Sequence, residues 1–208
     1  FLRDDKGAVR ASFFTIGYAK KDSDPAQRPI TFAFNGGPGS SSIWLHMGIM
    51  GPRRVVVNDG GYAPPPPSQL VDNAYSPLDV TDIVMIDPVG TGFSKPLGDA
   101  KPADFHGVDE DIRSVAQFIK RYVSENGRWG SPKYVLGESY GGFRAAKVAR
   151  ALQNDQGIIV SGIVMVSPML ETSYQWNSGR DPFKAALQFP SLVATELERT
   201  KKFTPEAM

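Results

Sequence analysis

Ser139 is the residue of this chain best suited to act as a nucleophile. It lies at the centre of Gly137-Glu138-Ser139-Tyr140-Gly141, between the apolar run 133–136 and an amphipathic stretch. A strand that turns sharply into a helix lifts such a serine above the sheet, and the turn requires small residues such as Gly137 and Gly141 on either side. The helix N-terminus favours the negative charge that develops there. The pattern predicts acyl transfer at Ser139; the alternative is a serine in an ordinary turn.

A glycine-rich segment, Asn35-Gly36-Gly37-Pro38-Gly39, follows an earlier apolar run. Glycine lets the backbone approach a substrate closely, and a loop at this place commonly supplies the second donor of an oxyanion hole. We predict that the N–H groups of Gly37 and Tyr140 form this hole. A phosphate-binding loop is the competing interpretation, but the Gly-Lys-Ser/Thr ending of such loops is absent.

A second glycine-containing segment, residues 87–94, follows another apolar run. It superficially suggests a nucleotide-binding loop, but it lacks the third glycine of the dinucleotide fingerprint. We interpret it as a loop that lines the pocket at the same edge of the sheet.

The two histidines of the chain, His46 and His106, both precede Ser139. A serine nucleophile needs a base, normally a histidine oriented by an acid, and after a strand–serine–helix turn these residues follow the serine. We expect His46 to be packed or pocket-lining and His106 to be solvated. Asp155 and Glu171 follow Ser139, but no histidine follows them.

Three short apolar runs, 82–87, 133–136 and 162–166, predict strands that are buried on both faces of a parallel sheet. Apolar residues recur at three- and four-residue steps over 108–123 and 143–152, which predicts two amphipathic helices. Such alternation of strand and helix is typical of a doubly wound α/β sheet.

The two ends of the chain follow other patterns. Residues 11–19 and 29–35 are rich in aromatic and β-branched residues and predict two strands joined by a turn, with an antiparallel edge. After residue 170 the strand pattern stops, and residues 182–187 and 192–198 predict short helical pieces around Pro190.

The composition bears on possible partners. The 208 residues include 23 Lys and Arg against 22 Asp and Glu, a formal charge of +1, so we expect no recruitment of nucleic acid or of an anionic membrane. There is no cysteine, which excludes disulfides and thiolate chemistry. No apolar run reaches the roughly 20 residues that span a bilayer. We expect neither a metal nor a cofactor.

Three segments together resemble the serine carboxypeptidase family in order and approximate spacing, namely residues 35–42, 87–94 and 137–142. The resemblance implies an α/β-hydrolase fold, with a mostly parallel doubly wound sheet and antiparallel N-terminal strands. It also implies a serine-type carboxypeptidase that hydrolyses C-terminal peptide bonds through an acyl-enzyme on Ser139, acts on peptides with a free C-terminus and works outside the cytoplasm.

The resemblance further implies that Asn35, Gly36 and Glu138 bind the terminal carboxylate of the substrate. Because a carboxyl group can bind a carboxylate only if one of the two is protonated, we expect a mildly acidic optimum. The alternative for Glu138 is a buried carboxyl that braces the turn through bonds to the backbone.

The sequence departs from the family pattern at three positions. Ser40 stands where the family often has a cysteine, Ala33 where it commonly has a tryptophan, and Ile49 where it commonly has a glutamate. These departures extend the plausible substrates to esters or to acyl transfer.

Because no acid–histidine pair follows Ser139, we expect the acid, the base and the last strands to lie in a C-terminal part beyond these residues. The fold would then be incomplete at the C-terminus, with residues 1–178 as the N-terminal part of the core and 179–208 as the start of a helical cap. We expect this chain alone to be inactive. The alternatives are an esterase or acyltransferase with the same nucleophile, or a non-catalytic binding module.

Overall fold

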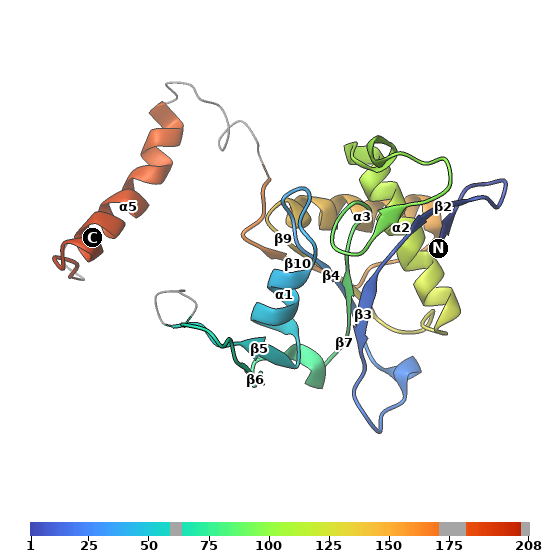
Figure 1. Cartoon of the computed structure of the whole chain (residues 1–208), viewed down its shortest axis with the longest axis horizontal. Coiled ribbons are helices and arrows are strands. Elements are labelled where there is room, and N and C mark those ends of the chain that lie inside the picture. The colour runs from blue at the N-terminus through green and yellow to red at the C-terminus, as the bar shows by residue number, and fades with distance from the viewer. Residues whose placement is uncertain (59–63, 171–181, 205–208) are drawn as a thin grey trace. The chain divides into compact units, whose positions relative to one another are not determined.

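The computed structural model describes residues 1–58, 64–170 and 182–204 (Figure 1). The chain divides into two compact units, Phe1–Met169 and Leu170–Met208, which are described separately. The boundary predicted between residues 178 and 179 lies outside the described residues.

A five-stranded sheet forms the centre of the first unit (Figure 1). Its strands are, in spatial order, β10 (Gly162–Val166), β9 (Lys133–Glu138), β4 (Ile30–Phe34), β7 (Asp82–Ile86) and β3 (Thr15–Tyr18). Neighbouring strands are parallel except β3, which is antiparallel to β7. The mostly parallel sheet with an antiparallel N-terminal strand is therefore confirmed. However, β7 lies between β3 and β4, so the two N-terminal runs do not pair with each other.

Smaller elements surround this sheet. One small antiparallel sheet contains β1 (Leu2–Arg3), β2 (Val9–Ser12) and β8 (Lys95–Pro96), and another contains β5 (Arg53–Val55) and β6 (Leu70–Asp72). Short 3-10 helices occupy Pro25–Gln27, Pro77–Asp79 and Pro102–Phe105. The predicted strand over 11–19 is thus divided between β2 and β3, because each part pairs with a different partner.

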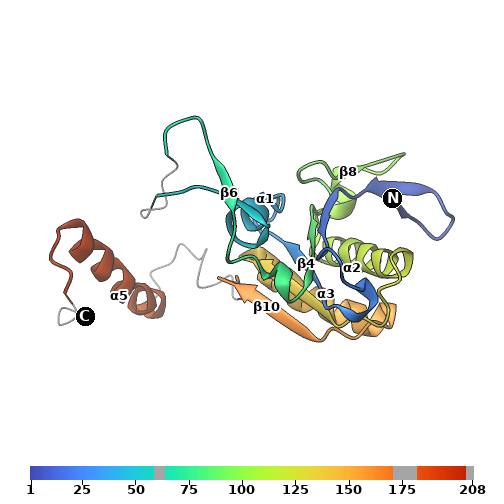
Figure 2. The same ribbon diagram turned by 90° about the horizontal axis from the view of Figure 1, so that it is seen from below.

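Helices cover both faces of the sheet. On one face, α2 (Val108–Glu125) and α3 (Tyr140–Gln156) lie side by side (Figures 1 and 2). On the other face, α1 (Ile43–Leu45) continues into a π-helical turn, η2 (His46–Met50). Side chains alternate along β4, since Phe32 and Phe34 pack in the cluster under α2 and α3, whereas Ala33 packs in the cluster under α1. The predicted doubly wound arrangement follows from this alternation.

The buried face of α3 differs from the predicted one. The spacing of Phe143, Ala146, Ala149 and Leu152 predicts this helix, but of these only Leu152 is buried, and Ala145 and Val148 complete the buried stripe. Alanine occurs on several sides of α3. The apolar pattern therefore predicts a helix but does not predict which of its sides faces the core. The helix ends at Gly157, whose φ of 70° suits a glycine C-cap.

Strand β10 is more exposed than predicted. Ile163, Val164 and Met165 are 38 to 44% exposed. Within the described residues β10 pairs only with β9 and forms the edge of the sheet. The prediction that this run is buried on both faces is therefore wrong for the structure described.

A buried charge cluster lies at the starting ends of the parallel strands. Asp82, the first residue of β7, accepts bonds from Arg28 Nε to Oδ1 and from Arg128 Nη1 to Oδ2, each 2.8 Å long. Arg128 also donates to the carbonyl oxygens of Arg28 and Pro29, which precede β4. One carboxylate therefore joins three chain segments.

The described part of the second unit, residues 182–204, contains the helix α5 (Pro182–Arg199). Both short pieces predicted here fall within it, and Pro190 lies inside the continuous helix rather than between two helices. A proline removes one helical hydrogen bond, which here does not end the helix. None of the described helices is both long and apolar enough to cross a membrane.

Candidate active site

The chain turns at Ser139 directly from β9 into α3, as predicted. Ser139 has φ 59° and ψ −122°, a backbone conformation that non-glycine residues seldom adopt. Its N–H donates to Val166 O at 2.9 Å, and its own carbonyl oxygen accepts from the N–H groups of Gly142 and Met169. These bonds hold the strained residue in place. Strained backbone held by its surroundings in this way is common at functional sites.

The glycines of the turn are required by space. A Cβ atom on Gly137 would lie 1.8 Å from Gly141 O, and one on Gly141 would lie 2.8 Å from Phe34 O. Both distances are far below van der Waals contact with backbone atoms. The two small residues predicted around Ser139 therefore allow β9, α3 and the end of β4 to meet.

We expect Gly137→Ala to lower the free energy of unfolding of the full-length protein by at least about 3 kcal/mol, because the backbone of the turn would have to move. Urea denaturation measures this change. Gly130→Ala is the matched control, since a Cβ there meets nothing within 4 Å, and we expect it to change stability by less than about 1 kcal/mol. Equal effects of the two substitutions would contradict the steric explanation.

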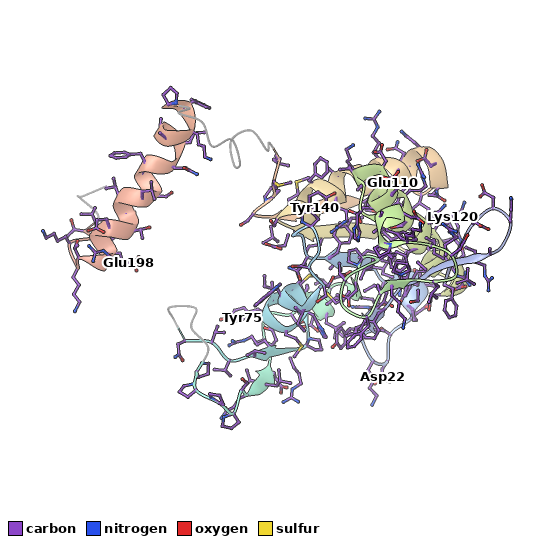
Figure 3. All side chains as sticks on the ribbon, turned by 45° about the horizontal axis from the view of Figure 1, so that its top comes forward. Asp22, Tyr75, Glu110, Lys120, Tyr140 and Glu198 are labelled. Atoms are coloured by element: carbon purple, nitrogen blue, oxygen red, sulfur yellow. The ribbon has the colours of Figure 1, made fainter. Side chains whose placement is uncertain are left out.

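The structure brings the predicted oxyanion segments together. A Cβ on Gly36 would lie 2.6 Å from both Tyr140 N and Glu138 O, so the loop after β4 lies directly against the turn. Gly37 has φ +108°, a conformation that favours glycine. Tyr140 is the first residue of α3 (Figure 3). Within the described residues no acceptor bonds the N–H of Gly37 or Tyr140, and their role as oxyanion donors remains a prediction.

Asn35, Gly36 and Glu138 also come together. Asn35 Nδ2 donates to Glu138 Oε2 at 3.0 Å, and the N–H of Gly36 approaches the same oxygen at 3.4 Å. Asn35 Oδ1 accepts the N–H of Leu45 at 3.0 Å, which fixes the orientation of the amide. The alternative role of Glu138 is to brace the turn through bonds to the backbone, and the contact with the N–H of Gly36 also fits that role.

Asn35 and Glu138 line a cavity of about 410 Å³ together with Gly37 and Ser139. Asn35, Glu138 and Ser139 form its polar side. Trp44 and Ile49 form an apolar wall and are 71% and 49% exposed. The arrangement places the Ser139 hydroxyl, hydrogen-bonding groups and an apolar surface within reach of one small ligand.

A second cavity of about 250 Å³ flanks the glycine loop at Pro38 and Gly39. Tyr140 lines it, together with residues 88–91. Burial raises the pKa of the Tyr140 hydroxyl, and the nearby carboxylate of Asp111 raises it further. Tyr140 therefore presents a neutral phenol to this cavity.

The loop 87–94 braces the site as well as lining the second cavity. Asp87 Oδ1 accepts the N–H of Ser42 at 2.8 Å. Ser94 Oγ donates to the carbonyl oxygen of Asp87 at 2.6 Å and accepts the N–H of Phe14 at 2.7 Å. The loop thereby ties the start of α1 to the segment that precedes β3.

The histidines lie as expected. His46 is buried, and its Nε2 is 2.6 Å from the hydroxyl of Tyr18. Burial lowers the pKa of His46, and the carboxylate of Asp87 opposes this only in part. His106 is exposed, as is Asp155 near the end of α3. Glu171 lies outside the described residues, among which no group of three His, Asp or Glu side chains could hold a metal.

Arg144 is a functional candidate that the sequence patterns do not predict. It projects from α3 and is only 2% exposed, with its Nε 2.8 Å from Asp111 Oδ2 and its Nη1 2.8 Å from the carbonyl oxygen of Asn35. A cationic residue at a buried position of a helix is a signal that could have identified Arg144. Using that signal requires knowing which side of α3 faces the core.

Together, the mostly parallel sheet, the strained serine between strand and helix and the adjacent glycine loop define an α/β-hydrolase. The family model described as serine carboxypeptidase matches residues 1–204. The chain therefore belongs to the serine carboxypeptidase family.

Individual relatives are similar over most of this chain. Serine-type carboxypeptidase F of Aspergillus niger is 34% identical over 154 residues, which cover 73% of this chain and 26% of the relative. Serine carboxypeptidase-like 10 of Arabidopsis thaliana is 27% identical over 196 residues, which cover 89% of this chain and 42% of the relative. The chain thus spans less than half the length of either relative.

A solved structure has the same fold. The prohormone-processing carboxypeptidase of Saccharomyces cerevisiae superimposes with a TM-score of 0.68 at 24% identity, over 89% of this chain and 40% of that structure. At this identity the likeness shows the fold alone.

Proposed function

We propose that the full-length protein is a serine-type carboxypeptidase that releases C-terminal residues from peptides. The observation that carries the proposal is the cavity that Asn35 and Glu138 share with Ser139, with the N–H of Gly36 directed at the same Glu138 oxygen as Asn35 Nδ2. Amide and N–H donors bind a carboxylate well, since hydrogen bonds to a charged group are among the stronger ones. Their position beside the nucleophile would place the last peptide bond of a substrate at Ser139.

In the proposed reaction, Ser139 Oγ attacks the carbonyl carbon of the last peptide bond and loses its proton to a base. The N–H groups of Gly37 and Tyr140 stabilise the oxyanion of the tetrahedral intermediate. The bond to nitrogen then breaks, the protonated base returns a proton to the departing amine, and water hydrolyses the acyl-enzyme.

We place the orienting acid and the base in the part of the full-length protein beyond these 208 residues, and we assign residues 179–208 to the start of a cap over the site. Both assignments rest on membership of the family and on the order of triad residues in this fold. Location outside the cytoplasm rests on family membership alone.

Two matched substrates test the proposal, an N-acylated dipeptide with a free C-terminus and the same dipeptide as its C-terminal amide. We expect the full-length protein at mildly acidic pH to cleave the free acid with a kcat/KM about 100-fold higher, because two or more charge-assisted hydrogen bonds are lost with the amide. Equal cleavage of the two substrates would contradict a carboxypeptidase.

An esterase or acyltransferase is the second candidate. Ile49 lines the cavity and brings no charge to it, which leaves fewer groups to recognise a carboxylate than the family pattern provides. Cleavage of a neutral N-acyl amino acid ester with no preference for the free carboxylate would favour this function. Binding of both substrates without cleavage would favour a binding module.

A further inference from the structure

A buried guanidinium group lies behind the end of β4. Arg144 forms an ion pair with Asp111 of α2, and its Nη1 donates a hydrogen bond to the carbonyl oxygen of Asn35. The guanidinium carbon is 5.3 Å from the ring centre of Phe34 and 5.0 Å from that of Tyr140. The ion pair and the two rings fix the plane of the guanidinium group. The orientation of its hydrogen bond to the carbonyl oxygen of Asn35 is therefore fixed as well.

The carbonyl oxygen of Asn35 and the N–H of Gly36 belong to the same peptide unit. This peptide is not among the cis bonds of the chain, and in a trans peptide the C=O and the N–H point in opposite directions. Arg144 holds the oxygen on the side of α2 and α3. The N–H of Gly36 must then point to the other side, where it meets Glu138 Oε2.

We propose that Arg144, oriented by Asp111, is a positioning residue that fixes the Asn35–Gly36 peptide for recognition of the substrate's terminal carboxylate. The inference rests on the proposed function and deepens it. Without the bond from Arg144, the peptide could rotate, and the donors of Asn35 and Gly36 would lose their shared direction. Arg144 touches neither the substrate nor Ser139 in this scheme, so its effect is on carboxylate binding.

A purely structural brace would behave differently. A brace stabilises the turn as a whole and its loss would slow the cleavage of every substrate alike. A positioning residue for the carboxylate acts mainly on substrates that carry one. The ratio of activities on two substrates therefore separates these roles.

The test uses the full-length protein and two substrates, the free-acid dipeptide and an N-acyl amino acid ester without a carboxylate. Arg144→Lys keeps the positive charge but loses the planar fork that contacts Asp111 and Asn35 together. We expect kcat/KM on the free acid to fall about tenfold, mainly through a higher KM, and activity on the ester to fall less than about threefold. An equal loss on both substrates, or none, would overturn the proposal.

Arg128→Lys is the matched control. Arg128 is also buried, pairs with an aspartate and donates to backbone carbonyls, but it lies at the opposite ends of the strands. We expect it to leave the ratio of the two activities unchanged, and a shift as large as that of Arg144→Lys would count against the proposal.

A second variant keeps the test decisive if Arg144→Lys does not fold. Asp111→Asn leaves the guanidinium in place but removes the charge that orients it, and we expect the same selective loss on the free acid. If the unmodified protein itself shows no preference for the free carboxylate, the proposed function fails and the inference falls with it. If that preference is present and neither variant weakens it, the inference alone fails.

Discussion

Ser139→Ala in the full-length protein is expected to lower kcat for peptide cleavage by at least about 10⁴-fold while the protein stays folded. The hydroxyl of Ser139 is the group that forms and breaks the acyl bond in the proposed reaction. The strained backbone at this position is held by its own N–H, which donates to Val166 O, and by its carbonyl oxygen, which accepts from Gly142 and Met169, and none of these bonds involves the side chain. The substitution should therefore remove the chemistry and leave the turn intact.

The same variant separates catalysis from binding. We expect Ser139→Ala to bind the free-acid dipeptide with an affinity within a few-fold of the unmodified protein, measured by calorimetry. Ser161→Ala is the control, since Ser161 follows α3 and precedes β10 at the far ends of the strands. Residual activity within tenfold of the unmodified protein would refute Ser139 as the nucleophile.

Asp82→Asn is expected to lower the free energy of unfolding by about 3 to 5 kcal/mol near neutral pH. The substitution leaves the guanidinium groups of Arg28 and Arg128 in a buried cluster without the negative charge that pairs with both. Denaturation with urea measures the change. Asp79→Asn is the control, because Asp79 is exposed and, within the described residues, its carboxylate forms an ion pair only with Lys20, and it should cost less than about 1 kcal/mol.

The effect of Asp82→Asn should depend on pH. Burial acts to raise the pKa of Asp82, but the hydrogen bonds from Arg28, Arg128 and the N–H of Lys20 outweigh it, so the pKa is lowered. A group with a lowered pKa in the folded state contributes its full stability above its unfolded pKa of about 3.9 and loses it as the pH falls through the folded value. The difference between the two proteins should therefore be constant near neutrality and shrink below about pH 4. A difference that grows in acid would contradict the assignment.

The segments that form the candidate site could be predicted from short sequence motifs, whereas the buried residues that hold these segments in place could not. The turn at Ser139 and the loop at Gly37 have sequence signatures because steric demands fix their residue types. Arg144 has no such signature, since α3 would be a helix with this residue on either face. Its proposed role depends on Asp111 of another helix. The apolar periodicity of two distant segments does not predict which of their side chains pair.

The fold shows the same division. The strands and helices of the core follow from apolar periodicity, and the antiparallel edge follows from residue type. The neighbour of each strand does not, because β3 has the same pattern whether it pairs with β4 or β7. The exposure of β10 likewise depends on which elements lie beside it, and its apolar sequence does not predict those elements.

Strand β7 begins at the buried charge cluster and ends beside the cavities. Asp82 is its first residue, and Asp87, which accepts the N–H of Ser42 at the start of α1, follows its last. The two ends of one strand thus serve stability and the proposed active site separately. Selection or laboratory evolution could therefore change the heat tolerance of this protein through substitutions around Arg28 and Arg128 while the proposed substrate site stays the same.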